Sequence, residues 1–421
     1  MKVLINKSKI SGKVRAPSSK SYTIRGLMCA ALAKGESEIV YPLSSDDTEA
    51  AINTLSKIGI RIHQNRDSWQ VSGGSFQEPT SELNCGESAA TLRFMTAVCS
   101  LVPGSCRLVA GLSLSKRPVK PLVQALRQLG VNCSCQDDLA PVIVEGGRLM
   151  GGTTELPGNI SSQFVSALLL ISPFAEEGVT IRLTTPLESK PFVLMTLECL
   201  KEFGIEVGFS KDLREFKISK QRYKPARYRV EGDWSSASYL LALGAIGGEV
   251  EVGNLNVESL QGDRIILDLL KDMEVSVKVN KNSVTVKGSR LKAIRADLSD
   301  CIDLLPTLAV LAATADGASE FTGIERARIK ESNRVSAVEE GLERMGIKVE
   351  EGRNRLVVVG SSPKGAVIES YDDHRIAMAF GTLGLIAGNT IINHAECVSK
   401  TFPQFWEFFQ NIGGKVDLDG K

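Results

Sequence analysis

The chain has 421 residues, of which 43% are hydrophobic, and its 50 basic residues nearly balance its 49 acidic ones. This length predicts two domains, because a single core rarely grows so large. A net charge of +1 argues against a general binder of nucleic acid or another polyanion, so any anion site must come from a local cluster of charges.

The cysteines and the apolar segments narrow the class of protein further. Nine cysteines are scattered along the chain, and only Cys133 and Cys135 lie close together in sequence. An odd number of cysteines in a long chain without a signal peptide predicts reduced thiols and a cytoplasmic location. With only three histidines a zinc site is not expected, and no apolar run reaches the roughly 18 residues of a membrane span.

The first predicted helix begins within residues 17–25, after a short apolar strand at residues 3–5. Small hydroxyl residues here are helix N-cap signals, and a helix N-terminus attracts anions through its free N–H groups. Lys20 and Arg25 add two cations. The stretch therefore indicates a phosphate or carboxylate site, and a capped surface helix with solvated basic residues is the alternative.

A helix that ends at a glycine and leads into a short strand occurs six times. Leu or Ile at positions i, i+3 and i+4 gives each helix one apolar stripe, and the glycine supplies its C-cap. Successive end positions lie 71, 74, 70, 72 and 67 residues apart. These positions are Gly59, Gly130, Gly204, Glu274, Gly346 and Gly413.

A second helix pattern alternates with the first. Each copy is a loop of Ser, Thr, Asp or Gly followed by a helix that is apolar on almost every side, and we expect such helices to be buried. The copies begin near Pro17, Gly86, Gly158, Gly232, Leu298 and Tyr371. Six units in two groups of three predict two domains, with a seam near Arg227-Tyr228 and a second crossing of the chain between the domains near residues 13–17.

Polar residues gather at the starts of the buried helices, which pseudo-symmetry would direct toward a common centre. Lys330 and Arg334 are expected on one cationic face of a helix, with Glu331 on the neighbouring face; a solvated charged helix is the alternative. For Asp303 the alternative is a simple N-cap. Many fixed cations with a few acids suit small, multiply anionic substrates and acid–base chemistry by side chains alone, without a metal or cofactor.

Eight motifs match the 3-phosphoshikimate 1-carboxyvinyltransferase (EPSP synthase) family in order and spacing, and the chain resembles that family over essentially its whole length. The resemblance implies an α/β (α+β) fold of two similar domains, each of three βαβαββ-type units with buried helices and outer sheets, and an active site in the cleft between the domains. It also implies that residues 1–15 form one domain with residues 228–421, and that residues 16–227 form the other. The motifs are Ser19-Lys20-Ser21 through Arg25, Arg117-Pro118, Ser161-Ser162-Gln163, Ser189-Lys190-Pro191, Glu231-Gly232-Asp233, Lys330-Glu331-Ser332-Asn333-Arg334, Asp373-His374-Arg375 and Lys400-Thr401-Phe402-Pro403.

The resemblance also implies a reaction: the enolpyruvyl group of phosphoenolpyruvate moves to the 5-hydroxyl of shikimate 3-phosphate by addition and elimination, releasing phosphate. It implies Asp303 as the base for the hydroxyl, with Glu331 and Lys20 as candidates for protonating the methylene carbon. The phosphoenolpyruvate site would contain Lys20, Ala89, Arg117, Gln163, Arg334, Arg375 and Lys400. The shikimate 3-phosphate site would contain Lys20, Ser21, Arg25, Ser161, Ser162, Gln163, Ser189, Asp303 and Lys330.

We expect small-molecule substrates only, no nucleic acid or membrane partner, and a monomer. The alternatives are the enolpyruvyltransferase that acts on UDP-N-acetylglucosamine, which carries a Cys shortly before its Arg-Pro, and a non-catalytic anion-binding relative. Residues 111–118 contain no Cys. The chain also departs from the family pattern: Glu87 replaces an Asn, Arg326 stands where some members have Asn, and Ala89 replaces a Gly, which predicts reduced sensitivity to glyphosate.

Overall fold

The computed structural model describes residues 1–419, and contacts divide the chain into two compact units. The split unit contains Met1–Pro17 and Gly232–Lys421, and the continuous unit contains Ser18–Glu231. The unit limits at residues 17 and 231 lie two and four residues beyond the predicted limits at 15 and 227. The second difference has a simple cause: β14 (Arg227–Arg229) pairs in parallel with β3 (Gly35–Val40), so this strand belongs to the continuous unit.

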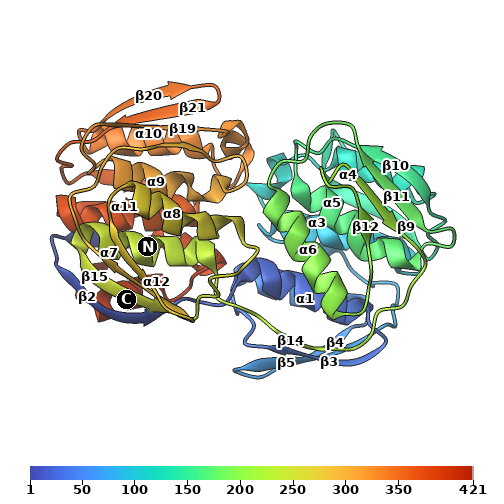
Figure 1. Cartoon of the computed structure of the whole chain (residues 1–421). Helices are drawn as coiled ribbons and strands as arrows, with labels where there is room; N and C mark the ends of the chain where they lie inside the picture. The colour runs from blue at the N-terminus through green and yellow to red at the C-terminus, as the bar shows by residue number, and fades with distance from the viewer. Residues whose placement is uncertain (420–421) are drawn as a thin grey trace. The chain divides into compact units, whose positions relative to one another are not determined.

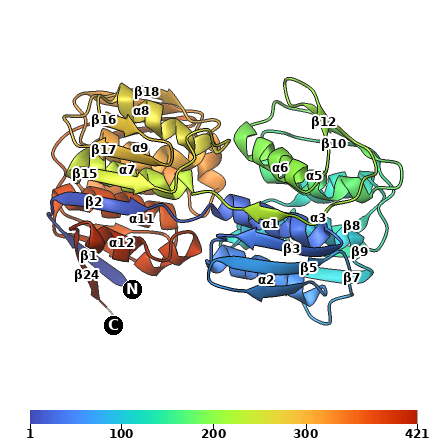
Figure 2. The same ribbon diagram turned by 60° about the horizontal axis from the view of Figure 1, so that its bottom comes forward.

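Six four-stranded sheets share one topology. In one of them, β11 (Val179–Leu183) runs parallel to β10 (Gly152–Leu156) and antiparallel to β13 (Glu215–Ile218), which pairs antiparallel with β12 (Gly208–Phe209). The same arrangement of one parallel and two antiparallel pairings recurs in the other five sheets. The sheets lie on the outside of each unit (Figures 1 and 2).

Three of these sheets are completed by strands from distant parts of the sequence. In the split unit, β1 (Lys2–Asn6) lies between β23 (Thr390–Asn393) and β24 (Lys415–Asp419), and β2 (Ile10–Arg15) pairs with β15 (Gly248–Gly253). The third case is β14, already described. The remaining strands are β4 (Arg61–Gln64), β5 (Ser68–Gly73), β6 (Leu83–Asn84), β7 (Gly104–Val109), β8 (Asn132–Gln136), β9 (Leu139–Gly146), β16 (Ser276–Val279), β17 (Ser283–Lys287), β18 (Arg295–Asp297), β19 (Ala318–Thr322), β20 (Lys348–Gly352), β21 (Arg355–Val359) and β22 (Val367–Glu369).

The helices predicted to be apolar on all sides form the interior of each unit. Nearly every residue of these helices is buried, as expected for a helix without a polar face. In the continuous unit α3 (Ala89–Val98) packs against α1 (Lys20–Leu32) and α5 (Ser162–Ile171). In the split unit α7 (Trp234–Gly247), α9 (Leu305–Ala312) and α11 (His374–Ala387) pack against one another in pairs.

The six amphipathic helices end where the repeat predicts. All six end positions have positive φ, including Glu274 at 61°, a non-glycine residue in the left-handed region. The predicted repeat and buried-helix arrangement are therefore confirmed. The helices are α2 (Asp46–Lys57), α4 (Lys120–Gln128), α6 (Lys190–Glu202), α8 (Ile266–Asp272), α10 (Arg334–Arg344) and α12 (Phe405–Asn411). The short 3₁₀ helices are η1 (Cys99–Leu101), η2 (Leu114–Lys116), η3 (Ser172–Phe174), η4 (Gly262–Ile265), η5 (Ile302–Leu304), η6 (Glu325–Ile329) and η7 (Ala395–Lys400).

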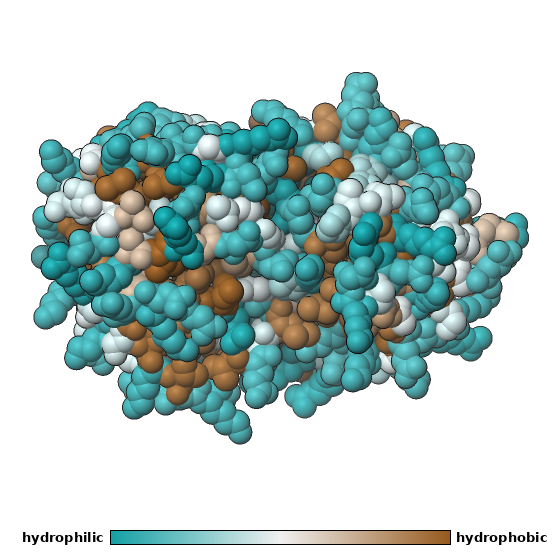
Figure 3. Space-filling model, turned by 45° about the horizontal axis from the view of Figure 1, so that its top comes forward, coloured by the Kyte–Doolittle hydropathy of each residue, from teal (hydrophilic) through white to brown (hydrophobic). Residues whose placement is uncertain are grey.

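Each unit has its own hydrophobic core, and hydrophobic side chains also reach the surface in places (Figure 3). The most exposed large hydrophobic residue is Leu112 at 87%, in the loop before η2. All nine cysteines are free thiols. Within residues 1–419, no helix has both the length and the apolar character that crossing a membrane would require.

Candidate active site

The predicted site residues form one cluster in each unit, and each cluster gathers at the starts of the buried helices. Short polar side chains cap these helices, as the sequence predicts. Ser19 accepts from the Tyr22 N–H at the start of α1, and Asp373 accepts from the Arg375 N–H at the start of α11. These caps fix the backbone from which the functional side chains extend.

In the continuous unit Lys20 is the first residue of α1, and an acid holds its ammonium group. The Lys20 Nζ lies 2.8 Å from Oδ2 of Asp47, which is buried in the first turn of α2. Sequence analysis did not assign Asp47, because an acid in the first turn of a helix is ordinarily explained by the helix dipole. The pair keeps the Lys20 charge at the N-terminus of α1.

Arg25 is 2% exposed and is held entirely by neutral oxygen atoms. Its Nε donates to the Thr196 hydroxyl at 2.8 Å, and its two Nη atoms donate to the carbonyls of Ser21 and Phe192, each at 3.0 Å. The guanidinium also lies 5.4 Å from the Phe94 ring centre. Burial lowers the Arg25 pKa, but an arginine in a protein stays charged. The result is a rigid cation with no carboxylate partner among residues 1–419.

Arg93 connects three segments that carry predicted site residues. Its Nη1 donates to the Ser161 hydroxyl at 3.1 Å and to the Gln163 side-chain oxygen at 2.7 Å, and its Nη2 donates to the Pro118 carbonyl at 3.4 Å. Sequence analysis gave Arg93 no substrate role. Nothing in the sequence around Arg93 indicates that its side chain reaches residues at the start of α5.

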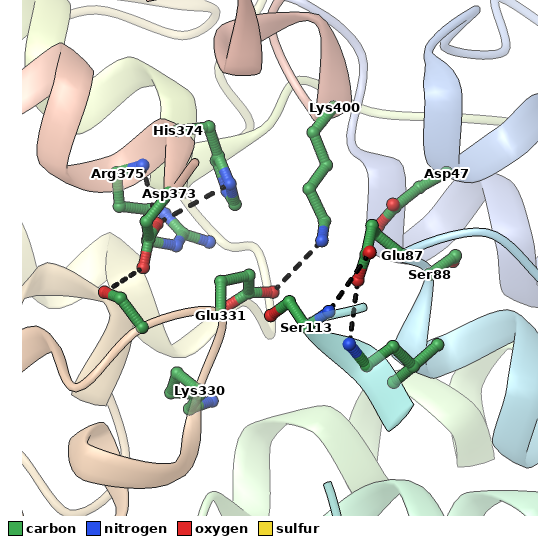
Figure 4. Close-up of polar contacts among 12 residues, drawn as sticks. Asp47, Glu87, Ser88, Ser113, Lys330, Glu331, Asp373, His374, Arg375 and Lys400 are labelled. Atoms are coloured by element: carbon green, nitrogen blue, oxygen red, sulfur yellow. Dashed lines mark hydrogen bonds and ion pairs between the residues drawn. The ribbon is translucent and has the colours of Figure 1, made fainter. Parts of the chain in front are cut away.

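Four other predicted residues of this unit are buried near helix starts, and Ser21 is half-buried. Ser162 and Ala89 are the first residues of α5 and α3, and Ser189 precedes α6 in the left-handed region with φ 53°. Arg117 follows η2 and is 8% exposed. Near α3, the Glu87 carboxylate is directed toward Ser113, which is part of the loop before Arg117 (Figure 4).

In the split unit Asp303, in η5 before α9, is surrounded by three cations. Its Oδ1 lies 2.7 Å from Arg334 Nη1 and 3.4 Å from Lys330 Nζ, and its Oδ2 lies 3.2 Å from Arg375 Nη2. Burial opposes ionisation of this carboxyl, but Arg375, Lys330 and Arg334 together lower its pKa well below the usual value. Asp303 is therefore a carboxylate at any physiological pH.

Arg334 is 1% exposed and contacts three carboxylates. Besides Asp303, it donates to Glu331 at 2.5 Å and through Nε to Asp373 at 2.8 Å. Glu331 in turn lies 3.7 Å from Lys400 Nζ, and Figure 4 shows its side chain directed toward Lys400. The cations and acids of this cluster are thus interlocked, with four cations against the three carboxylates.

The expectation that Lys330, Glu331 and Arg334 lie on one helix is wrong. Asn333 caps α10, its side chain accepting from the Ser336 N–H, so the helix begins only at Arg334. Lys330 and Glu331 lie in the preceding turn, and Lys330 has an extended backbone. Lys330 and Arg334 still converge, because both reach the same oxygen of Asp303.

Burial shifts the pKa of two groups in or near this cluster. Burial lowers the Lys330 pKa to about 8, although Asp303 favours its charged form. Asp263 is a buried acid that sequence analysis missed; burial and then repulsion from Asp303 raise its pKa to about 7, and Ser235 donates to its carboxylate. Nothing in its local pattern distinguishes Asp263 from an ordinary surface acid near a helix.

Comparison with known proteins agrees with this architecture. A model of the EPSP synthase (3-phosphoshikimate 1-carboxyvinyltransferase) family matches residues 5–409. A protein of Dehalococcoides mccartyi named 3-phosphoshikimate 1-carboxyvinyltransferase is 51% identical over 421 residues, covering 100% of both chains. One of the same name from Methanocaldococcus jannaschii is 39% identical and covers 97% of both chains.

Among solved structures, EPSP synthase from Acinetobacter baumannii superimposes with a TM-score of 0.84 at 26% identity, covering 99% of this chain and 100% of the other. This agreement extends over both units, with their six sheets and six buried helices. The chain belongs to the EPSP synthase family.

Proposed function

We propose that this protein transfers the enolpyruvyl group of phosphoenolpyruvate to the 5-hydroxyl of shikimate 3-phosphate and releases phosphate. In the addition step the hydroxyl loses its proton, its oxygen bonds to C2 of phosphoenolpyruvate, and C3 gains a proton to become a methyl group. In the elimination step the methyl group loses a proton and the bond from C2 to the phosphate oxygen breaks. The protein needs only acids, bases and anion-binding groups for these steps.

The continuous unit would mainly supply recognition. Arg25 and Ser21, with the serines at 161, 162 and 189, would bind shikimate 3-phosphate, and Gln163 would contact both substrates. Lys20, Arg117 and the backbone at Ala89 would bind phosphoenolpyruvate. The neutral partners of Arg25 support this role, because its charge is not cancelled before an anion arrives.

The split unit would supply the acid–base chemistry. Asp303 would accept the hydroxyl proton, and Glu331 or Lys20 would protonate C3 of phosphoenolpyruvate. Arg334, Arg375 and Lys400 would bind the anionic groups of phosphoenolpyruvate, and Lys330 would bind shikimate 3-phosphate. The coupling of these charges does not assign the C3 proton to one residue, since interacting groups titrate together.

The single observation that carries the proposal is the set of three cations on Asp303. Without substrate these cations hold its pKa low, so the carboxylate is a weak base. Anionic substrates would draw the same cations to themselves, and the Asp303 pKa would rise toward the range in which it accepts a proton. Substrate binding would then activate the base.

The test is phosphate release from phosphoenolpyruvate, measured separately with shikimate 3-phosphate and with UDP-N-acetylglucosamine as acceptor. We expect turnover only with shikimate 3-phosphate. Turnover only with the nucleotide sugar would support the alternative enzyme, and no turnover with either would support a non-catalytic relative.

Asp303→Asn tests the assignment of the base. The amide has nearly the shape of the carboxyl group but cannot accept the proton, so we expect kcat to fall by roughly 10²–10⁴-fold. Binding of shikimate 3-phosphate, measured by calorimetry, should persist. A variant with near-normal kcat would remove Asp303 from the mechanism.

We also propose that the enzyme works as a monomer in the cytoplasm. Its odd number of cysteines, all present as free thiols, supports a reducing compartment. Light scattering of the purified protein with and without both substrates tests the monomer, and a dimer mass in either state would contradict it.

A further inference from the structure

We propose that Glu87 is a positioning residue: its carboxylate fixes the loop that carries Arg117 and so determines the affinity for phosphoenolpyruvate. The inference rests on the proposed function for the identity of that substrate. Glu87 lies just before α3, and the site described above gives it no role. An unneutralised carboxylate beside an anion site would weaken binding, so the contacts of this side chain need an explanation.

The Glu87 carboxylate caps η2 from a different segment of the chain. Its Oε2 accepts from the Leu114 N–H at 2.8 Å, and its Oε1 accepts from the Ser113 N–H at 3.2 Å (Figure 4). Amide groups at the start of a helical turn have no partner within the turn, and hydrogen bonds to a charged acceptor are the stronger kind. The negative charge of Glu87 is thus directed at the backbone of η2.

This contact leads directly to Arg117. The Arg117 N–H donates to the Leu114 carbonyl at 3.0 Å, so one turn of backbone separates the Glu87 contact from the guanidinium-bearing residue. Leu114 itself is buried and anchors the turn, although the neighbouring Leu112 is 87% exposed. A shift of the turn would therefore move Arg117.

Gly111 provides the space for this arrangement. A Cβ atom placed on Gly111 would lie 2.2 Å from Glu87 Oε1 and 2.7 Å from its carboxyl carbon. The Gly111 N–H also donates to the Gly86 carbonyl at 2.8 Å, so the two segments are joined through both backbone and side chain. Any side chain at position 111 would displace the carboxylate.

The same helix holds the other end of the segment. Arg93, one turn into α3, donates to the carbonyl of Pro118 at 3.4 Å. Glu87, just before α3, and Arg93, within it, therefore hold the backbone on either side of Arg117, and α3 is also the helix that presents Ala89. We infer that α3 and Arg117 form one preorganised unit for the anion, which lowers the cost of ordering the arginine on binding.

Glu87→Gln tests the proposal, because it keeps the shape and one oxygen but puts an NH₂ group against a backbone donor. We expect KM for phosphoenolpyruvate to rise by roughly tenfold or more, in keeping with the loss of a charged hydrogen bond, while KM for shikimate 3-phosphate changes less than about twofold. Hydrogen exchange of the Ser113 and Leu114 amides should accelerate. An unchanged or lower KM for phosphoenolpyruvate would overturn the proposal.

Gly111→Ala provides a second variant that keeps the charge and displaces the carboxylate. It should raise the same KM and accelerate exchange at the same amides, and its effect should not add to that of Glu87→Gln, because both changes break one contact. Additive effects would overturn the proposal. If Glu87→Gln fails to fold, Gly111→Ala decides alone: a normal KM for phosphoenolpyruvate would overturn the proposal.

Glu78→Gln is the matched control. Glu78 accepts the Ser105 N–H at 2.8 Å and lies against Gly104 in the same unit, but it borders β7 rather than a predicted site residue. It should leave both KM values unchanged. Wild-type turnover reports separately on the proposed function: if the wild type is inactive, that function fails, while the exchange measurement still tests the Glu87 contact.

Discussion

Two buried arginines, one in each unit, are held in opposite ways. Arg25 in the continuous unit donates only to a hydroxyl and two carbonyls, whereas Arg334 in the split unit donates to three carboxylates. Both are almost inaccessible to solvent. Neutral partners orient a cation and leave its charge to attract an anion, whereas carboxylate partners cancel the charge, and in the case of Asp303 the neighbouring cations lower the pKa of the acid.

The comparison indicates a division of labour within one family fold. In the proposed function, the continuous unit would offer charge for recognition, and the split unit would offer interlocked acids and cations for proton transfer. Because the six units share one topology, this difference comes from the residues at the helix starts and not from the backbone.

The largest expected effect comes from replacing each arginine and comparing how much stability the protein loses. Arg334→Met removes the one cation that contacts all three carboxylates, Asp303, Glu331 and Asp373, and should destabilise the protein by about 3–5 kcal/mol. Arg25→Met leaves only neutral acceptors without their donor and should lower the free energy of unfolding by about 1–3 kcal/mol. Differential scanning calorimetry of the two variants at one pH measures the difference.

The matched control is Arg344→Met on α10, where the arginine pairs with Glu340 at the surface, with both side chains more than 40% exposed. We expect a loss of less than about 1 kcal/mol there. Equal losses for Arg334→Met and Arg25→Met would show that their partners do not differ in energy.

Ala89→Gly sharpens the assignment of recognition to the continuous unit. Removing a buried methyl group at the start of α3 relieves crowding worth about 1–3 kcal/mol, so glyphosate should inhibit the variant at roughly tenfold lower concentration or less. The kcat should change little, because no proton-transfer group is touched. Inhibition assays against phosphoenolpyruvate measure this, and an unchanged inhibition constant would count against a role of Ala89 in inhibitor selection.

A smaller effect is expected in the pH dependence of kcat/KM, through the titration of Lys330 in the split unit. Burial lowers the Lys330 pKa to about 8, so the side chain is charged below that pH and neutral above it. We expect kcat/KM for shikimate 3-phosphate to fall by up to about tenfold per pH unit above pH 8. Lys330→Arg, which stays charged, should lose this decline, and a decline that persists in the variant would point to another group.

Most of the fold could be predicted from the sequence because its signals are local. The apolar stripe and the terminal glycine of each amphipathic helix mark its bounds, and the left-handed backbone at Glu274 follows from its place in the repeat. The buried helices follow from their lack of a polar face. The strand pairing of residues 227–229 could not be predicted in the same way, because β3, its partner, lies far away in the sequence.

The site was predicted as a set of residues but not as a set of contacts. Cations at helix starts are visible in the sequence, whereas the partners of Arg334 come from η5, α11 and the turn before α10. Asn333 caps α10, so the helix begins after Lys330. This cap is a local sequence signal, but the prediction relied instead on the spacing of the charged residues. The buried Asp263 and the loop contacts of Glu87 depend on tertiary packing and could not be read from spacing.

The strand β1 has a consequence for how the protein is made. It lies between β23 and β24, and β24 begins only at Lys415, so the sheet cannot close until the ribosome has delivered nearly the whole chain. The continuous unit needs only residues 18–231 and can fold while synthesis proceeds. Until residues 390–393 and 415–419 are made, the β1 segment lacks both of its sheet partners, and this interval is when the growing chain most needs protection from aggregation.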